Sequence, residues 1–281
     1  MILSISAYAK INLFLDVHEK RPDGYHDLNS VMQQVSLCDT VSAKRLDSGI
    51  VITCTDPAIP TDERNIAHKC ARAFFEHYKL SGGTGIHIEK HIPSAAGLAG
   101  GSSDGAAVLT LLNRLYGTGA DVGTLCGIGA KIGADIPFCI RGGTCICEGI
   151  GEILTPLTLP KPAYSVLIAF PGNGVSTAEA FRRLDTTADD SAGHDISDVL
   201  TPLRDGKIPT ALYNSFERAI LPIHPGASGL RRLMLENGAA AAMMSGSGPS
   251  VFGLFASPEA RDAAADVLSS AGALLYPCEP V

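Results

Sequence analysis

The sequence predicts a protein of mixed strands and helices divided into two lobes, and three observations indicate this. Apolar and polar residues alternate over residues 3–17, as they do in a half-buried strand. Residues 85–92 alternate in the same way and lead, through a glycine-rich segment, into apolar residues at helical spacing that end near Gly117. Prolines punctuate residues 155–162, where a junction between two lobes is expected.

Length and charge limit the class of protein. A chain of 281 residues with 46% hydrophobic residues can form one large or two moderate domains. It has no apolar run long enough to span a bilayer, and its start lacks the basic region and cleavage site of a signal peptide. A cytoplasmic location is therefore expected. The formal charge of −7 and the absence of a long Lys/Arg run disfavour nucleic acid or an anionic membrane as partner.

The eight cysteines are spaced irregularly and follow no export signal, so thiols, mostly buried, are favoured over disulfides. Cys145 and Cys147 fall on one face of an expected strand, a pattern too sparse for a zinc site.

The segment from residue 93 to residue 104 joins an expected strand to an expected helix. Its small residues let backbone N–H groups turn toward a ligand, and the helix N-terminus adds unsatisfied donors and a partial positive charge. Hydroxyl groups at Ser102 and Ser103 can cap the helix or touch a phosphate. The residues expected to surround a polyphosphate are Pro93, Ser94, Ala95, Ala96, Gly97, Leu98, Ala99, Gly100, Gly101, Ser102 and Ser103.

Two familiar phosphate motifs do not fit this segment. A Walker loop needs lysine after its last glycine, whereas Gly101 is followed by Ser102. A dinucleotide fingerprint needs a different glycine spacing from that of Gly97, Gly100 and Gly101. Without further information, a tight turn that binds nothing explains the segment equally well.

Other candidate residues also have simpler explanations. Tyr8, Lys10 and Asn12 share one face of the first strand, which a solvated outer face would explain. Asp135 precedes Ile136-Pro137, where it would cap a turn. Residues 22–24 form a turn signal that leaves Tyr25 partly exposed in a hairpin.

Further elements are expected along the chain. Residues 62–65 begin a helix with acidic residues in its first turn, and Asn65 is a helix-start residue. Residues 185–207 are acidic and loop-rich, and residues 213–217 are expected on a helix. Residues 243–255 indicate a hairpin, and residues 274–276 a final strand.

Residues 93–103 read Pro-x-x-x-Gly-Leu-x-Gly-Gly-Ser-Ser, which resembles the second motif of the GHMP small-molecule kinases. Residues 7–13 resemble the first motif of that family and residues 243–255 the third, in family order. The resemblance implies an α+β fold with a ribosomal-protein-S5-like lobe in residues 1–155 and a ferredoxin-like α/β lobe in residues 156–281. It also implies ATP and Mg²⁺ as cofactors, the ion being held largely by ATP oxygens and water with no protein ligand assigned.

The resemblance also implies catalytic roles. Lys10 matches an active-site lysine, and Asp135 matches the family's catalytic aspartate, here assigned as the general base with Lys10 as its cationic partner. Asn65 is expected on the adenine side of ATP.

Arg-x-Asp-Gly-Tyr-His is typical of members that phosphorylate a cytidine diphosphate conjugate, in which Tyr25 and His26 contact the cytosine. Phe181 matches the aromatic residue opposite the tyrosine, although a buried phenylalanine explains it equally well. Asn12 and Thr177 are expected on the substrate side. The expected partners are therefore ATP and this small molecule, bound by a monomer or a weak homodimer.

Two departures from the family pattern are Ala99, where glycine is common, and Asp104, where a neutral residue is common. Asp104 is expected to alter helix capping and to place a charge near phosphate, which would weaken ATP binding. A sister kinase of homoserine or mevalonate, and a nucleotide-binding module without activity, remain alternatives. The Gly24-Tyr25-His26 signature disfavours the first, and the presence of both Lys10 and Asp135 disfavours the second.

Overall fold

The computed structural model describes residues 1–188 and 193–281 and confirms an α+β fold. The chain forms two compact units whose segments alternate along the sequence. The first comprises Met1–Ala9, Cys38–Ile92 and Ala99–Gly142, and the second Lys10–Leu37, Pro93–Leu98 and Gly143–Val281. Compact units and family domains are defined differently, so this division does not test the predicted domain boundary at residue 155. That boundary stays a prediction.

Two long strands, β1 (Ile2–Lys20) and β2 (His26–Leu46), each contribute to both units. The alternation over residues 3–17 therefore belongs to one long strand. Alternation of exposure ends at Ala9, after which every side chain up to Leu15 is buried, polar ones included. Between the strands, the amide of Arg21 donates to the carbonyl of Tyr25 and closes the predicted turn.

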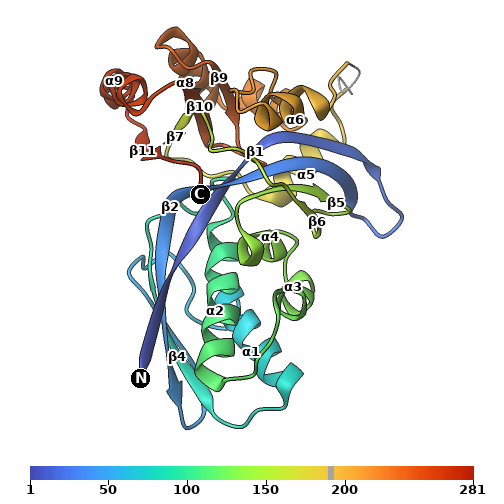
Figure 1. Cartoon of the computed structure of the whole chain (residues 1–281), viewed down its shortest axis with the longest axis vertical. Coiled ribbons are helices and arrows are strands. Elements are labelled where there is room, and N and C mark those ends of the chain that lie inside the picture. Colours follow the sequence, from blue (N-terminus) through green and yellow to red (C-terminus); the bar gives the residue numbers. More distant parts are fainter. Residues whose placement is uncertain (189–192) are drawn as a thin grey trace. The chain divides into compact units, whose positions relative to one another are not determined.

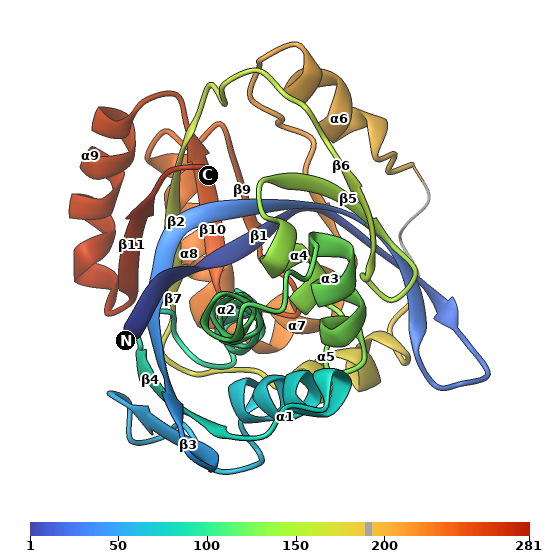
Figure 2. The ribbon, with the colours of Figure 1, turned by 60° about the horizontal axis from the view of Figure 1, so that its bottom comes forward.

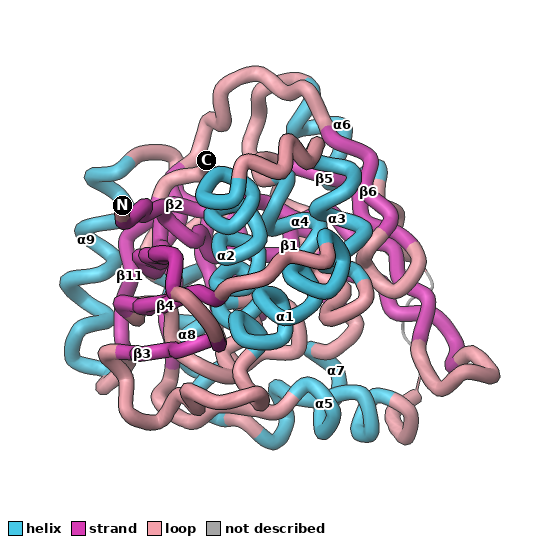
Figure 3. Tube along the Cα trace, turned by 90° about the horizontal axis from the view of Figure 1, so that it is seen from below, coloured by secondary structure: helices cyan, strands magenta, loops and turns pink. Residues whose placement is uncertain are grey.

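The first unit places helices against a sheet in which β3 (Gly49–Cys54) and β4 (Gly83–Glu89) continue the order β3-β4-β2-β1 (Figure 1). Figure 3 shows the helices of this unit in cyan beside the magenta strands β3 and β4. The helices are α1 (Ile66–Tyr78), α2 (Gly100–Tyr116), α3 (Val122–Ala130) and α4 (Ile136–Arg141).

Glycine lets α1 and α2 approach closely. A Cβ at Gly105 would lie 2.8 Å from the sulfur of Cys70 and 2.9 Å from Cγ2 of Ile66. The core between helices and sheet is apolar, with Phe74, Ile88 and Leu111 fully buried. The start of α2 is thus fixed by packing on α1.

The prediction for the start of α1 was partly wrong. The helix begins at Ile66 with Asn65 as its N-cap, as expected, but Asp62 and Glu63 precede it instead of lying in its first turn. Asp62 is held in its own turn by Arg64, whose side chain donates to the Asp62 carboxylate. The side-chain hydrogen bond of Arg64 holds the pKa of Asp62 down at about 2.

The second unit contains an antiparallel sheet in the order β11-β7-β10-β9. Leu167 of that sheet packs with Leu230 and Ala264 of two covering helices, which Figure 2 shows as α8 and α9. The elements of this unit are β5 (Thr144–Glu148), β6 (Ile153–Pro156), β7 (Ser165–Phe170), α5 (Thr177–Leu184), α6 (Ser197–Arg204), β8 (Tyr213–Asn214), α7 (Glu217–Ile220), α8 (Pro225–Glu236), β9 (Ala241–Met244), β10 (Val251–Phe255), α9 (Pro258–Leu268), β11 (Leu274–Cys278) and two 3₁₀ turns, Leu221–Ile223 and Ser269–Ala271.

One local prediction in this unit is confirmed in part and another is corrected. Residues 185–207 were expected to be loop-rich; α6 lies within this range, the other described residues of the range are loop, and residues 189–192 lie outside the described residues. Residues 213–217 do not share one helix, because Tyr213 and Asn214 pair with β1 as a short parallel strand. The amide of Phe216 donates to Oδ1 of Asn214, and this local side-chain acceptor favours a turn before α7. The hairpin of β9 and β10 and the final strand are confirmed.

All eight cysteines are thiols, as predicted; four are buried and four are partly buried. Within residues 1–188 and 193–281, no helix combines the length and apolar character that crossing a membrane requires.

We expect Tyr164→Phe to leave the free energy of unfolding unchanged or to raise it by about 1 kcal/mol. The Tyr164 hydroxyl is buried without a hydrogen-bond partner among the described residues, and burial raises the pKa of the phenol. Removing a buried polar group that has no partner removes a desolvation cost. Urea denaturation of the variant and the wild type measures the change.

Tyr116→Phe is the matched control, because the Tyr116 hydroxyl donates to the carbonyl of Gly83 at 2.8 Å. Loss of this hydrogen bond is expected to lower the free energy of unfolding by about 1 kcal/mol. Equal destabilisation by both substitutions would show that Tyr164 has a partner after all.

Candidate functional site

Along the glycine-rich segment, every second residue from Ala95 to Ala99 has a positive φ angle. Ala95, Gly97 and Ala99 have φ angles of 52°, 76° and 59°, in the left-handed region that L residues rarely adopt. Alternation of this kind turns successive N–H groups toward one side and forms a concavity that suits an anion. This backbone is compatible with phosphate binding, which stays a prediction.

The helix that follows begins without a side-chain cap. Its N-cap is Ala99, which has no side-chain acceptor, so the first N–H groups of α2 remain for a ligand or water. The two predicted hydroxyl groups differ. Ser103 is buried and donates to the carbonyl of Gly100 at 2.8 Å, whereas Ser102 is half-buried.

Within the second unit, the third motif packs directly on residues 96–98. The Ser245 hydroxyl donates to the carbonyl of Gly97 at 3.1 Å, and the amide of Ser250 donates to the carbonyl of Ala96 at 3.3 Å. A Cβ at Gly97 would lie 2.1 Å from the carbonyl oxygen of Ser245. Only glycine therefore permits this contact.

Lys10 lies beside the same two loops. Its amide donates to the carbonyl of Leu98 at 3.1 Å, and its Nζ donates to Oδ1 of Asn12 at 2.7 Å. A Cβ at Gly246 would lie 3.1 Å from Lys10 Nζ, which places the ammonium against the third loop. With 5% of Lys10 exposed, the solvated-face alternative was wrong.

Asn12 continues a chain of polar contacts away from Lys10. Its Nδ2 donates to the hydroxyl of Ser30 at 2.9 Å, and that hydroxyl donates to the carbonyl of Phe14 at 2.6 Å. The amide oxygen of Asn12 is thereby oriented toward the ammonium of Lys10.

Two side chains that hold the third loop in place, those of Asn214 and Glu217, were not assigned a role from the sequence. Asn214 Nδ2 donates to the carbonyls of Met244 and Gly246 at 2.7 and 2.9 Å. Glu217 Oε1 accepts from the amide of Met244 at 2.8 Å. The Asn-x-x-Glu spacing was the signal, but spacing alone does not show that both side chains hold backbone atoms of a distant loop.

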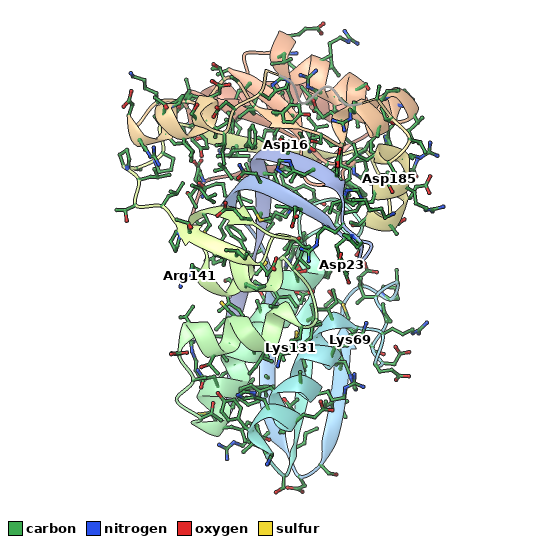
Figure 4. The ribbon with its side chains drawn as sticks, turned by 90° about the vertical axis from the view of Figure 1, so that its right-hand side faces the viewer. Asp16, Asp23, Lys69, Lys131, Arg141 and Asp185 are labelled. Carbon is green, nitrogen blue, oxygen red and sulfur yellow. The ribbon has the colours of Figure 1, made fainter. Side chains whose placement is uncertain are left out.

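The expected base-binding residues partly come together in the second unit. The rings of His26 and Phe181 are stacked, with centroids 5.1 Å apart. His26 Nδ1 donates to the carbonyl of His18 at 2.8 Å, and Nε2 lies 3.0 Å from Oδ1 of Asp185, labelled at the end of α5 in Figure 4. The hydroxyl groups of Thr177 and Ser247 are 3.2 Å apart, so α5 also touches the third loop.

Tyr25 is placed differently from the other candidates. It lies in the turn between β1 and β2 with 59% of its surface exposed, and its amide donates to Oδ1 of Asp23. The ring therefore has an open face, whereas His26 already covers one face of Phe181. A base held between Tyr25 and Phe181 stays a prediction.

Asp135 lies beside the start of α2, in the first unit. A Cβ at Gly133 would lie 4.0 Å from the hydroxyl oxygen of Ser102, so the Gly133-Ala134-Asp135 turn borders the first turn of that helix. Asp135 is the N-cap residue of α4, but its carboxylate does not make the capping hydrogen bond that the simpler explanation requires. Figure 4 labels Lys131 and Arg141, the basic residues at the ends of α3 and α4.

Asn65 uses its side chain within the protein. Oδ1 accepts from the amide of Ala67 at 2.8 Å, and Nδ2 donates to the carbonyl of Pro60 at 2.7 Å. Its helix-start role is confirmed, and its adenine contact stays a prediction.

Asp104 does not cap α2, which corrects the expectation for this residue. Its side chain is buried, and Oδ2 accepts from Lys90 Nζ at 2.9 Å. Its charge therefore faces a buried lysine.

A metal cage is absent from the part of the chain that the structure describes, where no three His, Cys, Asp or Glu side chains gather to hold an ion. A cavity of about 460 Å³, lined by Met1, Ile2, Lys44, Arg45 and Leu115, lies toward the opposite end of α2 from Gly100. None of these lining residues belongs to the three motifs.

The fold and these loops define a two-domain small-molecule kinase, and comparison with known proteins gives the family. The model for the N-terminal domain of GHMP kinases matches residues 65–143, and that for their C-terminal domain matches residues 204–274. The chain belongs to the GHMP kinase family, whose members use ATP.

Similar proteins narrow the comparison within the family. A 4-diphosphocytidyl-2-C-methyl-D-erythritol kinase of Clostridium botulinum (strain Eklund 17B / Type B) is 42% identical over 90% of this chain and 91% of its own. One of Synechococcus sp. (strain JA-2-3B'a(2-13)) is 43% identical over 94% and 89%. The crystal structure of a 4-(cytidine 5'-diphospho)-2C-methyl-D-erythritol kinase matches with a TM-score of 0.83 and 33% identity over 99% of both chains.

We expect Gly97→Ala to destabilise the protein by at least about 2 kcal/mol and to raise the KM for ATP about tenfold or more. The added Cβ would meet the Ser245 carbonyl, and the φ of 76° is unfavourable for alanine. Denaturation and steady-state kinetics measure the two effects.

Ala99→Gly is the control. It places glycine, which tolerates a positive φ, at a neighbouring position with the same backbone conformation, and it adds no atom. Its stability should change by less than about 1 kcal/mol. Normal ATP kinetics in Gly97→Ala would argue against a role of this contact in nucleotide binding.

Proposed function

We propose that this chain phosphorylates the 2-hydroxyl of 4-diphosphocytidyl-2-C-methyl-D-erythritol with ATP, giving the 2-phosphate and ADP. The observation that carries the proposal is identity above 40% to kinases of that substrate over at least 90% of this chain. The reaction belongs to the non-mevalonate route to isoprenoid precursors. A cytoplasmic location and a monomer or weak homodimer stay predictions.

The polyphosphate of ATP is proposed to lie on residues 93–103. The alternating backbone of Ala95, Gly97 and Ala99 and the uncapped N-terminus of α2 support this, because both offer N–H donors to an anion. Mg²⁺ would arrive with ATP, neutralise charge on its phosphates and keep water ligands.

Asp135 is proposed as the general base for the attacking hydroxyl. Its turn borders Ser102, at the helix end where the phosphates are proposed to lie. Phosphoryl transfer depends on positioning and on charge neutralisation, and a carboxylate near the transferring group is suited to accept the proton of the hydroxyl.

Lys10 is proposed as the cationic residue of the reaction and the partner of Asp135. The two residues belong to different compact units, so the local setting of each supports its role. Lys10 is buried against the second and third loops, and Asn12 orients its ammonium. A positive charge held there would stabilise negative charge that develops on the transferring phosphoryl group.

The cytosine is proposed to contact Tyr25 and His26, with Phe181 on its far side. The exposed ring of Tyr25 offers a stacking surface, and an aromatic face contributes about 1–3 kcal/mol per stacked base. His26, fixed between the His18 carbonyl and Asp185, would have to separate from Phe181 to admit a base to that ring.

A sister substrate is the second candidate. A homoserine kinase of Cytophaga hutchinsonii shares the fold with a TM-score of 0.79, but its 22% identity carries no further information on substrate. The Gly24-Tyr25-His26 turn favours the cytidine compound over homoserine or mevalonate.

ATP consumption by the purified protein with Mg²⁺ tests the proposal. The diphosphocytidyl methylerythritol substrate would be compared with homoserine and with mevalonate. Turnover with the cytidine compound alone is expected. Turnover only with another alcohol would reject the cytosine pocket, and binding of ATP without turnover of any substrate would favour a nucleotide-binding module.

Asp135→Asn is expected to lower kcat by about 10² or more, because the amide cannot accept the proton. The measurement is steady-state turnover with saturating substrates. Asp121→Asn is the control, since Asp121 is the exposed N-cap of α3 and asparagine also caps a helix. Near-normal kcat in Asp135→Asn would exclude the base assignment.

Tyr25→Ala is expected to raise the KM for the cytidine substrate roughly 5- to 150-fold, the equivalent of about 1–3 kcal/mol of stacking. The KM for ATP should not change. Tyr25→Phe keeps the ring and should keep the KM, so a loss in both variants would point to the hydroxyl and away from stacking.

A further inference from the structure

A buried cluster of three charged side chains lies in the first unit, outside the residues assigned above. Lys90 follows β4 and places its ammonium between Asp39 of β2 and Asp104 of α2. All three side chains are nearly inaccessible, with 5%, 0% and 4% of their surfaces exposed. One positive charge therefore faces two carboxyl groups in a region of low polarity.

The two carboxyl groups have unequal partners. Asp39 Oδ2 contacts Lys90, and Oδ1 accepts from the amides of His91 and Ile92 at 2.6 and 2.8 Å. Asp104 Oδ2 contacts Lys90, but Oδ1 is buried without a hydrogen-bond partner among the described residues. Hydrogen-bond donors stabilise a carboxylate, and Asp104 lacks the two backbone donors that Asp39 has, so Asp104 is the group suited to take up a proton.

The ionisation of the cluster follows from this arrangement. Burial raises the pKa of Asp104 to about 7, with Lys90 opposing the rise and Asp39 adding to it. Burial acts to lower the pKa of Lys90, but the charges of Asp104 and Asp39 outweigh it and raise that pKa. The charge of the cluster therefore changes by one near neutral pH, at Asp104, while Lys90 stays charged.

Among the described residues, the titratable side chains buried beside the cluster are thiols. On β3, burial raises the pKa of the Cys54 thiol, and on α1 it raises the pKa of the Cys70 thiol to about 12, so both stay neutral. Beside Gly105, α4 contributes the apolar Ile136, and Ala7 of β1 contributes a carbonyl near Ser103. The exposed Glu89 and His91 side chains pair with each other at 3.7 Å.

The cluster lies directly beneath the first turn of α2. A Cβ at Gly100, the first residue of that helix, would lie 2.9 Å from Lys90 Nζ and 3.0 Å from Cγ2 of Ile92. Asp104 is one helical turn further on. The amide of Ile92, immediately before residues 93–103, is held by Asp39. The cluster thus fixes both the entry to the glycine-rich segment and the helix end that follows it.

We propose that Lys90, Asp39 and Asp104 form a positioning cluster for nucleotide binding, in which Asp104 takes up a proton from solvent when a polyphosphate binds at the first turn of α2. The inference rests on the proposed binding of ATP by residues 93–103. An ionised Asp104 leaves one uncompensated negative charge beneath the N–H groups that face the phosphates. Protonation removes that charge, so anion binding and proton uptake favour each other.

The test compares the wild type with Asp104→Asn, whose amide has nearly the shape of the protonated acid. Calorimetry with ATP from pH 6 to pH 9 gives the Kd of each, and the titration of ATP itself cancels in their ratio. If binding raises the pKa of Asp104 by one unit, the wild-type Kd should worsen about tenfold relative to the variant across this range. Buffers of different ionisation enthalpy should also show greater proton uptake by the wild type.

Asp47→Asn is the matched control, because it removes an exposed carboxylate from the same unit and should keep the wild-type profile. Identical pH profiles for the wild type and Asp104→Asn, with ATP bound by both, would reject proton uptake by Asp104 and leave the proposed phosphate loop unaffected. No ATP binding by any of the proteins would overturn the proposed phosphate loop as well.

A measurement on the wild-type protein alone tests the proposal independently. The ¹³C shift of the Asp104 carboxyl in the wild type should titrate near neutral pH and move to higher pH with ATP. A carboxyl that stays ionised to below pH 5 with ATP would contradict the proposal.

Discussion

The close approach of two backbones at Gly97 is the constraint on which the site in the second unit depends. The carbonyl of Ser245 occupies the space where any other residue at position 97 would place its Cβ. The same approach lets Ser245 and Ser250 hydrogen-bond to residues 96 and 97, which lie about 150 residues earlier in the chain. Lys10 joins this arrangement through the Leu98 carbonyl, so the three motifs meet through main-chain contacts more than through side chains. Small residues are thus required by packing as much as by a ligand.

The first turn of α2 has to satisfy two demands that oppose each other. Its N–H groups favour an anion, yet Asp104 places a second carboxyl next to the carboxylate of Asp39, one turn below. Removing Lys90 would leave both carboxyl groups buried without a counter-ion, which is strongly unfavourable. The lysine is therefore required for the fold, whereas the proton on Asp104 remains adjustable. A site built in this way combines a rigid backbone with one variable charge.

The sequence predicted the parts of the structure that depend on local pattern. The period of two over residues 3–17 predicted β1, and the helical spacing after residue 104 predicted α2. It could not show that Lys10 and Asn12 are buried, because polar residues on one strand face are typical of an exposed surface. Asn214 and Glu217 were missed for a related reason, since their partners are carbonyl and amide groups about 30 residues later. The pairing of Asp104 with Lys90 likewise depends on tertiary contacts that neither residue indicates alone.

The two family-model matches cover some of the candidate site residues and leave others outside. Residues 65–143 and 204–274 include the proposed phosphate loop, Asp135 and the third loop. The Tyr25-His26 turn and α5, with Phe181 and Asp185, lie outside both ranges. A homoserine kinase with the same fold shows that the architecture does not select the substrate. Discrimination is therefore proposed to come from side chains such as His26, whose ring contacts Asp185 and a backbone carbonyl and lies against Phe181. Because both ring nitrogens already face protein groups, the position of the ring is fixed, and Nε2 can hydrogen-bond to a base only if it gives up its contact with Asp185.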